Sequence, residues 1–245
     1  MLQESLVVFA VALVGGVLPL VGKRSDRLLH LFIAFATGSF LGVVFLHLLP
    51  EVAAMAAEVT PGEGSATMPW LFVLLGVVVV YLLEKLLLNG SEESEHHQHA
   101  TVGYASLLGL CIHAFTSGMS LAAASQRPEL ADSLFLSVAS HKIAESFSLA
   151  TVFLLAGFSS RRTLATMVMF ALVTPAGMLA GDRMAHALSQ EGLAILTALA
   201  AGTFLFVALC DLLPEVFHHR VDALAKVVLL AAGIALGLFL PELGS

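Results

Sequence analysis

Charged residues are scarce in this sequence. Asp, Glu, Lys and Arg make up 12% of its 245 residues, about half the share that a soluble domain needs to cover its surface. Hydrophobic residues make up 58%, and the mean hydropathy is +0.95. We therefore expect most of the outer surface to face lipid rather than water. The net charge of −7 is small and scattered, so the basic footprint of a nucleic-acid-binding protein is missing.

Cysteine is almost absent as well. The two cysteines, Cys111 and Cys210, fall inside apolar stretches, where they behave as small hydrophobic residues. Neither a disulfide framework nor a CxxC redox pair is expected. The first five residues, MLQES, lack the basic segment of a signal peptide. The first apolar run is therefore predicted to be a retained membrane span.

Long apolar runs are what the sequence has in abundance. A helix needs about 20 mostly apolar residues to cross a bilayer. Eight such runs lie at 5–22, 30–57, 69–88, 102–124, 132–158, 163–187, 192–217 and 223–241. Their apolar character extends all round the helix, as lipid requires, and the connections are short. The sequence predicts an all-α integral membrane protein with eight transmembrane helices, in a single domain covering residues 1–245.

The basic residues of the connections predict the orientation. If the N-terminus lies outside, the inner side collects Lys23, Arg24, Arg27, Lys85, Arg161, Arg162, Arg220 and Lys226. The outer side then has only Arg127 and Arg183. Because positive charge accumulates on the cytoplasmic side, both termini are predicted to be external.

The longest polar insertion, residues 89–101, is predicted to be a cytoplasmic loop without fixed structure. Its histidines, His96, His97 and His99, stand beside glutamates, and such a tract binds metal weakly. The alternative is a solvated loop with no metal role.

A sequence element occurs twice. Residues 37–52 (TGSFLGVVFLHLLPEV) and 201–216 (AGTFLFVALCDLLPEV) are identical at nine of sixteen positions without a gap. A weaker similarity joins residues 113–122 and 141–150 in the fourth and fifth spans. The second and seventh spans run in opposite directions. The pattern predicts an inverted repeat that relates spans 1–3 to spans 6–8, with spans 4 and 5 pseudo-symmetric.

Several ionisable residues lie inside the predicted spans. Inserting such a side chain at the bilayer centre costs about 2.5–3.5 kcal/mol of free energy, so each one is expected to have a functional or structural role. His141 and Glu145 are four residues apart, and so are His113 and Ser117. This spacing places each pair on one helical face. The mixture of imidazole, carboxylate and hydroxyl suits zinc, iron, manganese or cobalt. A polar network that only holds the helices together is the alternative.

Two further pairs of ionisable residues occupy equivalent places in the repeat. His47 and Glu51 lie toward the outer end of the second span, whereas Asp211 and Glu215 lie toward the inner end of the seventh. They are predicted to serve as entry and release stations for a cation. Helix capping or contact with the membrane interface is the alternative explanation.

These motifs resemble those of the ZIP (Zrt/Irt-like) metal-ion transporters, and the resemblance extends over essentially the whole chain. The matching segments are HLLPE at 47–51, HxxxSG at 113–118, HKxxExFSL at 141–149, TPAG at 174–177 and DLLPE at 211–215. The His-Lys pair that begins the fifth-span motif resembles one branch of the family.

The resemblance implies import of a divalent metal, zinc above all, as a transported substrate rather than a cofactor. It also implies a metal site between spans 4 and 5 and a homodimer. The compact length of the sequence favours a location in the cytoplasmic membrane. Family members with two adjacent metals use ligands at three positions that are Ala114, Lys142 and Thr174 here. We expect Lys142 to take the place of a second cation beside Glu145. Many members carry an acid at the position of Ser117, so its hydroxyl predicts a weaker site.

Two other functions compete with metal transport by alternating access. A membrane metallohydrolase of the zincin type would need HExxH, whereas this chain has Lys142 in place of the catalytic Glu. An enzyme is therefore not expected. A proton- or cation-conducting protein that uses the same histidines and carboxylates as a relay is the other alternative.

Overall fold

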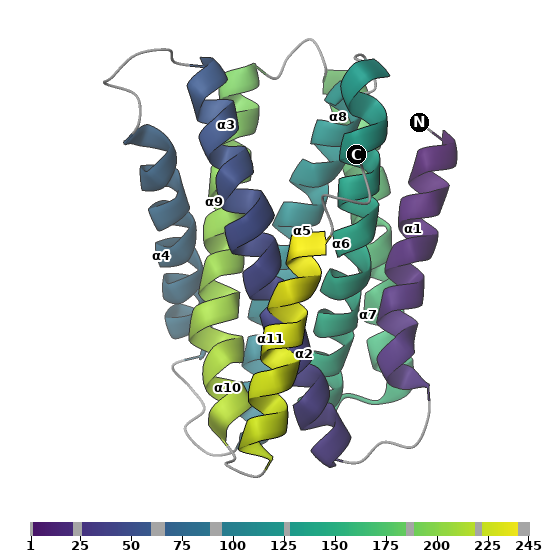
Figure 1. Ribbon diagram of the computed structural model, residues 1–245, viewed down its shortest axis with the longest axis vertical. Helices are drawn as coiled ribbons and strands as arrows, with labels where there is room; N and C mark the ends of the chain where they lie inside the picture. The colour runs from purple at the N-terminus through teal and green to yellow at the C-terminus, as the bar shows by residue number, and fades with distance from the viewer. Residues whose placement is uncertain are drawn as a thin grey trace.

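The computed structural model describes residues 2–21, 26–59, 67–88, 95–124, 128–184, 189–218 and 222–239, and all the regular elements among them are helices (Figure 1). The elements are α1 (Leu2–Val17), η1 (Leu18–Leu20), α2 (Asp26–Val43), η2 (Val44–Leu48), α3 (Leu49–Val59), α4 (Met68–Leu88), α5 (Glu95–Ala124), α6 (Pro128–Leu155), α7 (Ser160–Ala171), α8 (Val173–Met184), α9 (Gln190–Phe206), η3 (Val207–Leu212), α10 (Leu213–His218) and α11 (Ala223–Phe239). The prediction of an all-α protein is confirmed.

Each predicted apolar run overlaps one helix or a set of helices that follow one another directly. The clearest difference is at α5, which begins at Glu95 rather than near residue 102. The last part of the segment predicted as an unstructured loop, residues 89–101, is therefore helical from Glu95 onward.

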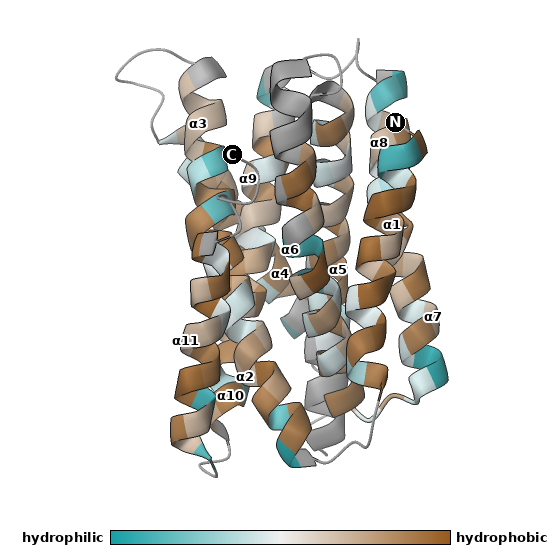
Figure 2. Ribbon diagram, turned by 45° about the vertical axis from the view of Figure 1, so that its right-hand side comes forward, coloured by the Kyte–Doolittle hydropathy of each residue, from teal (hydrophilic) through white to brown (hydrophobic). Residues whose placement is uncertain are grey.

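Long apolar helices dominate the described residues. Four helical stretches are long and apolar enough to cross a membrane: Leu2–Leu20, Arg27–Ala57, Ser160–Arg183 and Ala194–Phe217. Three shorter apolar helices cover Met68–Leu83, Ser106–Ala122 and Ala223–Leu238. Figure 2 shows hydrophobic residues along most of α1 and α11. Large apolar side chains of the outer helices are exposed, for example Leu74 of α4 at 57% and Leu224 of α11 at 79%, as helices that face lipid require.

Glycines bring the α2–α11 and α4–α9 pairs into close backbone contact. A Cβ atom on Gly38 would collide with the Leu230 carbonyl of α11, and one on Gly233 would collide with the backbone of α2. A Cβ on Gly76 would meet the backbone of α9, and one on Gly202 that of α4. Small residues at such crossings allow helices in lipid to gain packing energy at short range. These helices form one group in the bundle.

The α1–α6 and α5–α8 pairs are packed in the same way. A Cβ atom on Gly15 would collide with the Ile143 carbonyl of α6. A Cβ on Gly177 would collide with the Phe115 carbonyl of α5, and one on Gly118 with the backbone of α8. These helices, with α7, form a second group. The two groups meet along α2, α5, α6 and α9, where the largest cluster of buried apolar residues lies.

The elements α2, η2 and α3 follow one another directly and form one continuous rod, and α9, η3 and α10 form another. These two rods carry the repeated sequence, and each contains a π-helical segment, η2 or η3. In η2 the N–H of Leu49 donates to the carbonyl of Val44, and in η3 the N–H of Leu213 donates to that of Ala208. A proline stands two residues after the end of each segment, at Pro50 and Pro214. Proline has no N–H, and its ring clashes with the carbonyl four residues earlier. A local widening of the helix relieves that clash, and π-segments of this kind are frequent at functional sites.

Candidate metal centre

Four predicted ligands lie on α5 and α6 where these helices cross in the centre of the bundle. His113 and Ser117 share one face of α5, and His141 and Glu145 share one face of α6, because four residues make about one helical turn. The exposed fractions are 2% for His113, 5% for His141 and 1% for Glu145. A carboxylate and two imidazoles are therefore held together in a setting that excludes water.

The two imidazoles converge on a single oxygen atom. Nε2 of His113 lies 3.1 Å and Nε2 of His141 lies 3.4 Å from Oε1 of Glu145. One ligand atom from each of the three residues lies within 4.8 Å of the other two. Adjacent ligands of a tetrahedral zinc ion with bonds near 2.0–2.1 Å stand about 3.3 Å apart. The two distances to Glu145 already match this value, and a small closing movement of the two histidines would complete the geometry.

One of the atoms that face this point lacks an ordinary partner. Among the described residues, Nε2 of His141 is buried and makes no hydrogen bond, and the group nearest to Oε1 of Glu145 is the imidazole of His113, at 3.1 Å. Buried polar atoms are nearly always hydrogen-bonded, and exceptions require an explanation such as an ion. A polar network with only a structural role would be expected to satisfy this atom. The arrangement fits a cation ligand set better.

The ammonium group of Lys142 pairs with the second oxygen of the Glu145 carboxylate. Its ammonium nitrogen donates to Oε2 of Glu145 at 2.6 Å and lies 5.0 Å from the centroid of the Phe170 ring on α7. Lys142 is completely buried. An ion pair and a ring face together offset much of the cost of removing the two charges from water. Oε1 remains directed toward the histidines.

Ser117 and His47 stand next to these ligands. Oγ of Ser117 lies 3.2 Å from Nε2 of His113, close enough to supply a fourth, neutral ligand. His47 belongs to η2, and its ring centroid lies 6.5 Å from that of His141. Nε2 of His47 lies 2.9 Å from the Gly237 carbonyl. A carbonyl only accepts, so Nε2 donates, and Nδ1 of the neutral ring keeps its lone pair.

The other predicted residues are less close to the cluster. Glu51 is half-buried on α3. Glu215 is half-buried on α10, away along the bundle. Asp211 lies in η3, and its side chain is outside the described part of the structure. The side chains of His96, His97 and His99, at the start of α5, are outside it as well.

Two aromatic residues at the site were not predicted. Phe204 of α9 packs against His113 with ring centroids 4.8 Å apart, and Phe170 of α7 faces Lys142. Phe204 could have been found, because it occupies the same position of the repeated element as Phe40. Nothing in the sequence distinguishes Phe170 from the other 15 phenylalanines, since its role depends on how α7 packs on α6.

Comparison with known proteins identifies the family. The model of the ZIP zinc transporter family matches residues 2–100 and 89–241. The chain belongs to the ZIP zinc transporter family. The resemblance inferred from the motifs is therefore confirmed at the level of the family, whereas the His-Lys branch stays a prediction.

Several curated relatives are also named zinc transporters. The chain is 31% identical over 217 residues to zinc transporter ZIP13 of Pongo abelii, covering 82% of this chain and 63% of that protein. It is 24% identical over 267 residues to zinc transporter ZIP1 of Takifugu rubripes, covering 91% and 88% respectively. It is 24% identical over 253 residues to zinc transporter 3 of Arabidopsis thaliana, covering 86% and 73%. Together with the apolar helices, this similarity makes the chain an integral membrane transporter protein rather than an enzyme.

Proposed function

We propose that this protein moves divalent transition-metal ions, zinc above all, across the membrane through one intramembrane site. The observation that carries the proposal is the buried convergence of His113 and His141 on one oxygen of Glu145. Nitrogen and oxygen ligands without a thiolate suit an ion that must bind and then leave. Membership of the ZIP family supports the same conclusion.

The proposed architecture has eight spans in an inverted repeat. Two observations support it beyond the repeated sequence. Gly15 approaches the carbonyl of Ile143 and Gly177 that of Phe115, and the two carbonyls belong to corresponding residues of spans 5 and 4. Each of the two π-segments also ends at the first leucine of an LLPE motif, on rods that run in opposite directions (Figure 1). Repeats of this kind underlie many transporters that alternate access around a central site.

The proposed route follows the repeated rods. Metal reaches the site past Glu51 and His47, and it leaves past Asp211 and Glu215. The ligands lie on α5 and α6, in one helix group, whereas His47 and Glu215 lie on η2 and α10, which continue α2 and α9 of the other group. A displacement of one group against the other would change the end from which the ligands are reached. Ser117 completes the coordination, with a water molecule or Nδ1 of His47 as the remaining candidate.

Lys142 is proposed to replace a second metal. Its ammonium pairs with Glu145, and the neighbouring positions hold Ala114 and Thr174, which offer no carboxylate. A fixed cation at this place leaves one transport site per chain. The site without metal is close to neutral, because the single carboxylate and the ammonium compensate each other when the imidazoles are neutral.

The remaining features complete the proposal. The segment 89–101, with His96, His97 and His99, receives metal weakly on the cytoplasmic side. Both termini lie outside, the protein resides in the cytoplasmic membrane, and two copies form a homodimer. The positive charge on the inner connections supports this orientation. Transport is directed toward the cytoplasm, as the family resemblance implies.

Metal uptake into proteoliposomes tests the central claim. Unmodified protein should take up Zn²⁺ or Cd²⁺, and His141→Ala should reduce uptake to the level of empty vesicles because a ligand is lost. His30→Ala is the matched control, since His30 is half-buried at the start of α2, far along the rod from the ligands, and should leave uptake intact. Undiminished uptake by His141→Ala would refute the site.

Proton conduction through the same side chains is the alternative with a specific basis, because buried histidines and carboxylates also form proton relays. A pure proton path has no reason to bind zinc. Stabilisation of the detergent-solubilised protein by Zn²⁺ that disappears in His113→Ala would favour metal transport. Proton flux without any such stabilisation would favour the relay.

A further inference from the structure

Two phenylalanines stack in the centre of the bundle, at the same position of each copy of the repeat. The ring centroids of Phe40 on α2 and Phe204 on α9 lie 4.8 Å apart, and the ring planes are inclined by 22°. Their exposed fractions are 2% and 1%. The two rods that carry the LLPE motifs therefore touch through a dry pair of aromatic rings.

This stack lies directly against the candidate metal centre. The ring of Phe204 contacts that of His113 edge to face, with centroids 4.8 Å apart and an inclination of 60°. Phe204 belongs to the helix group that does not carry the ligands, so this contact crosses between the two groups. One wall of the ligand cluster is consequently an aromatic ring that offers no coordinating atom.

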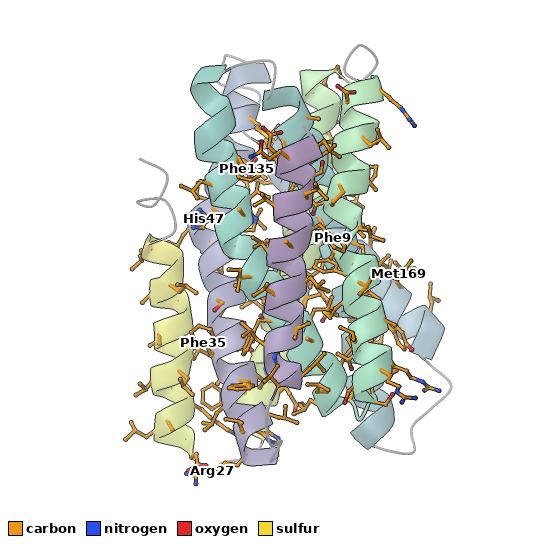
Figure 3. The ribbon with its side chains drawn as sticks, turned by 90° about the vertical axis from the view of Figure 1, so that its right-hand side faces the viewer. Phe9, Arg27, Phe35, His47, Phe135 and Met169 are labelled. Atoms are coloured by element: carbon orange, nitrogen blue, oxygen red, sulfur yellow. The ribbon has the colours of Figure 1, made fainter. Side chains whose placement is uncertain are left out.

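The position of the stack along the bundle is defined by its neighbours on α2. His47, whose ring faces His141, comes seven residues after Phe40, which corresponds to a rise of about 10 Å. Figure 3 shows the order on this rod, with His47 near the middle of the bundle and Phe35 and then Arg27 toward the end at which α2 begins. Phe40 thus lies between the level of His47 and the end at which α2 begins.

The same end receives α10. Glu215 follows Phe204 by eleven residues, about 16 Å along a rod that runs opposite to α2, and α10 lies near the start of α2 (Figure 1). The order along the bundle is therefore His47 with His141, then the Phe40–Phe204 stack, then Glu215. Val43 and Val207, both buried, extend the apolar zone beside the stack.

An apolar constriction of this kind opposes the passage of an ion. A divalent cation that leaves its ligands must regain water at once, and a dry aromatic pair offers neither water nor ligand oxygens. Hydrophobic constrictions close pores in other membrane proteins by excluding water. We propose that the Phe40–Phe204 stack is the barrier that separates the metal centre from the release path toward Glu215, and that its size controls the rate of release.

This proposal rests on the proposed metal transport and adds two residues to it that coordinate nothing. Phe204 also orients His113, so its substitution would change the ligand geometry along with the barrier. Phe40 is the better residue to vary, because its ring contact is with Phe204 and not with a ligand. The barrier predicts opposite effects of smaller and larger side chains at Phe40, whereas a purely structural role predicts loss of activity for both.

The test measures initial rates of Cd²⁺ uptake into proteoliposomes across metal concentrations. We expect Phe40→Leu to raise the maximal rate about threefold or more and Phe40→Trp to lower it by a similar factor, with the concentration for half-maximal uptake unchanged within about twofold. Phe40→Met retains more volume and should follow Phe40→Leu if that variant does not fold. Correct folding is checked by size-exclusion chromatography and thermal unfolding.

Phe153→Leu is the matched control. Phe153 is 1% exposed and packs in another ring cluster, with Tyr104 and Phe158 at centroid distances of 5.8 and 5.0 Å. It loses the same volume but should leave the rate unchanged. If the Phe40 variants behave like Phe153→Leu, or if the leucine and tryptophan variants both slow uptake, the barrier is refuted. Failure of unmodified protein to transport, or full uptake by His141→Ala, would instead refute the proposed function.

Discussion

The ammonium nitrogen of Lys142 lies 2.6 Å from Oε2 of Glu145, three residues further along α6, and at most 1% of either side chain is exposed. Their charges compensate each other inside the bundle. The remaining oxygen, Oε1, faces the imidazoles of His113 and His141. One carboxylate therefore serves both the stability of the helix bundle and the candidate metal centre, and substitutions separate the two roles.

The first prediction concerns the cost of breaking this pair. Glu145→Gln removes the negative charge and leaves a fully buried ammonium without its counter-ion, so we expect a loss of about 3–5 kcal/mol of stability. Lys142→Met should destabilise for the same reason. The double variant removes both charges and should recover most of the loss, because a buried ion pair is often replaceable by apolar or neutral groups of similar volume.

Denaturant unfolding in detergent, analysed as a double-mutant cycle, measures this coupling. Glu191→Gln is the control, since Glu191 is exposed at the start of α9 and should change stability little. Additive effects of the two buried substitutions would contradict the predicted pairing.

The second prediction concerns the number of bound metal ions. Unmodified protein should bind one Zn²⁺ per chain, because Lys142 holds the place beside Glu145. Lys142→Asp replaces the fixed cation by a carboxylate and should raise the number to two. Lys85→Asp makes the same charge change at an exposed position of α4 and should leave it at one. Elemental analysis of purified protein equilibrated with zinc measures the ratio, and two ions per unmodified chain would disprove the single-site hypothesis.

The third prediction concerns the close approach of α2 and α11. Gly38→Ala places a Cβ atom against the Leu230 carbonyl of α11, so the helices must separate, at a cost of about 1–3 kcal/mol. At Gly103 of α5 the same substitution meets only the Phe153 ring, at 3.6 Å, which is ordinary contact. Gly103→Ala should therefore be neutral or stabilise by about 0.5–1 kcal/mol, since alanine favours helices. Thermal unfolding compares the two, and equal stability would show that α2 and α11 are less tightly packed than described.

Most of the helices could be predicted from the sequence, because a lipid-facing helix needs a long apolar run and such runs are visible directly. The early start of α5 was missed, since Glu95 continues the helix into a polar segment that hydropathy assigns to a loop. The π-segments were missed too. Pro50 and Pro214 indicate a local disturbance, but only the packing of the rods decides whether the helix bends, breaks or widens there.

The candidate ligands also show which features the sequence predicts and which depend on the packing of the helices. A spacing of four residues places His141 with Glu145, and His113 with Ser117, on one face of each helix, and this follows from helix geometry alone. That the two faces meet, with both imidazoles at one oxygen of Glu145, depends on the crossing of α5 and α6. The contacts of Phe204 with His113 and of Phe170 with Lys142 join residues 91 and 28 positions apart in the chain.

The sequence by itself determined what lies along each helix: its apolar length, the ligand spacing on its face, the repeated LLPE element and the family to which the chain belongs. Only the tertiary structure decided which faces meet, because lateral contacts between helices depend on packing that no local pattern encodes. Glycine crossings set how closely the rods approach. That approach brings the ligands of α5 and α6 together and seats Phe40 and Phe204 beneath them.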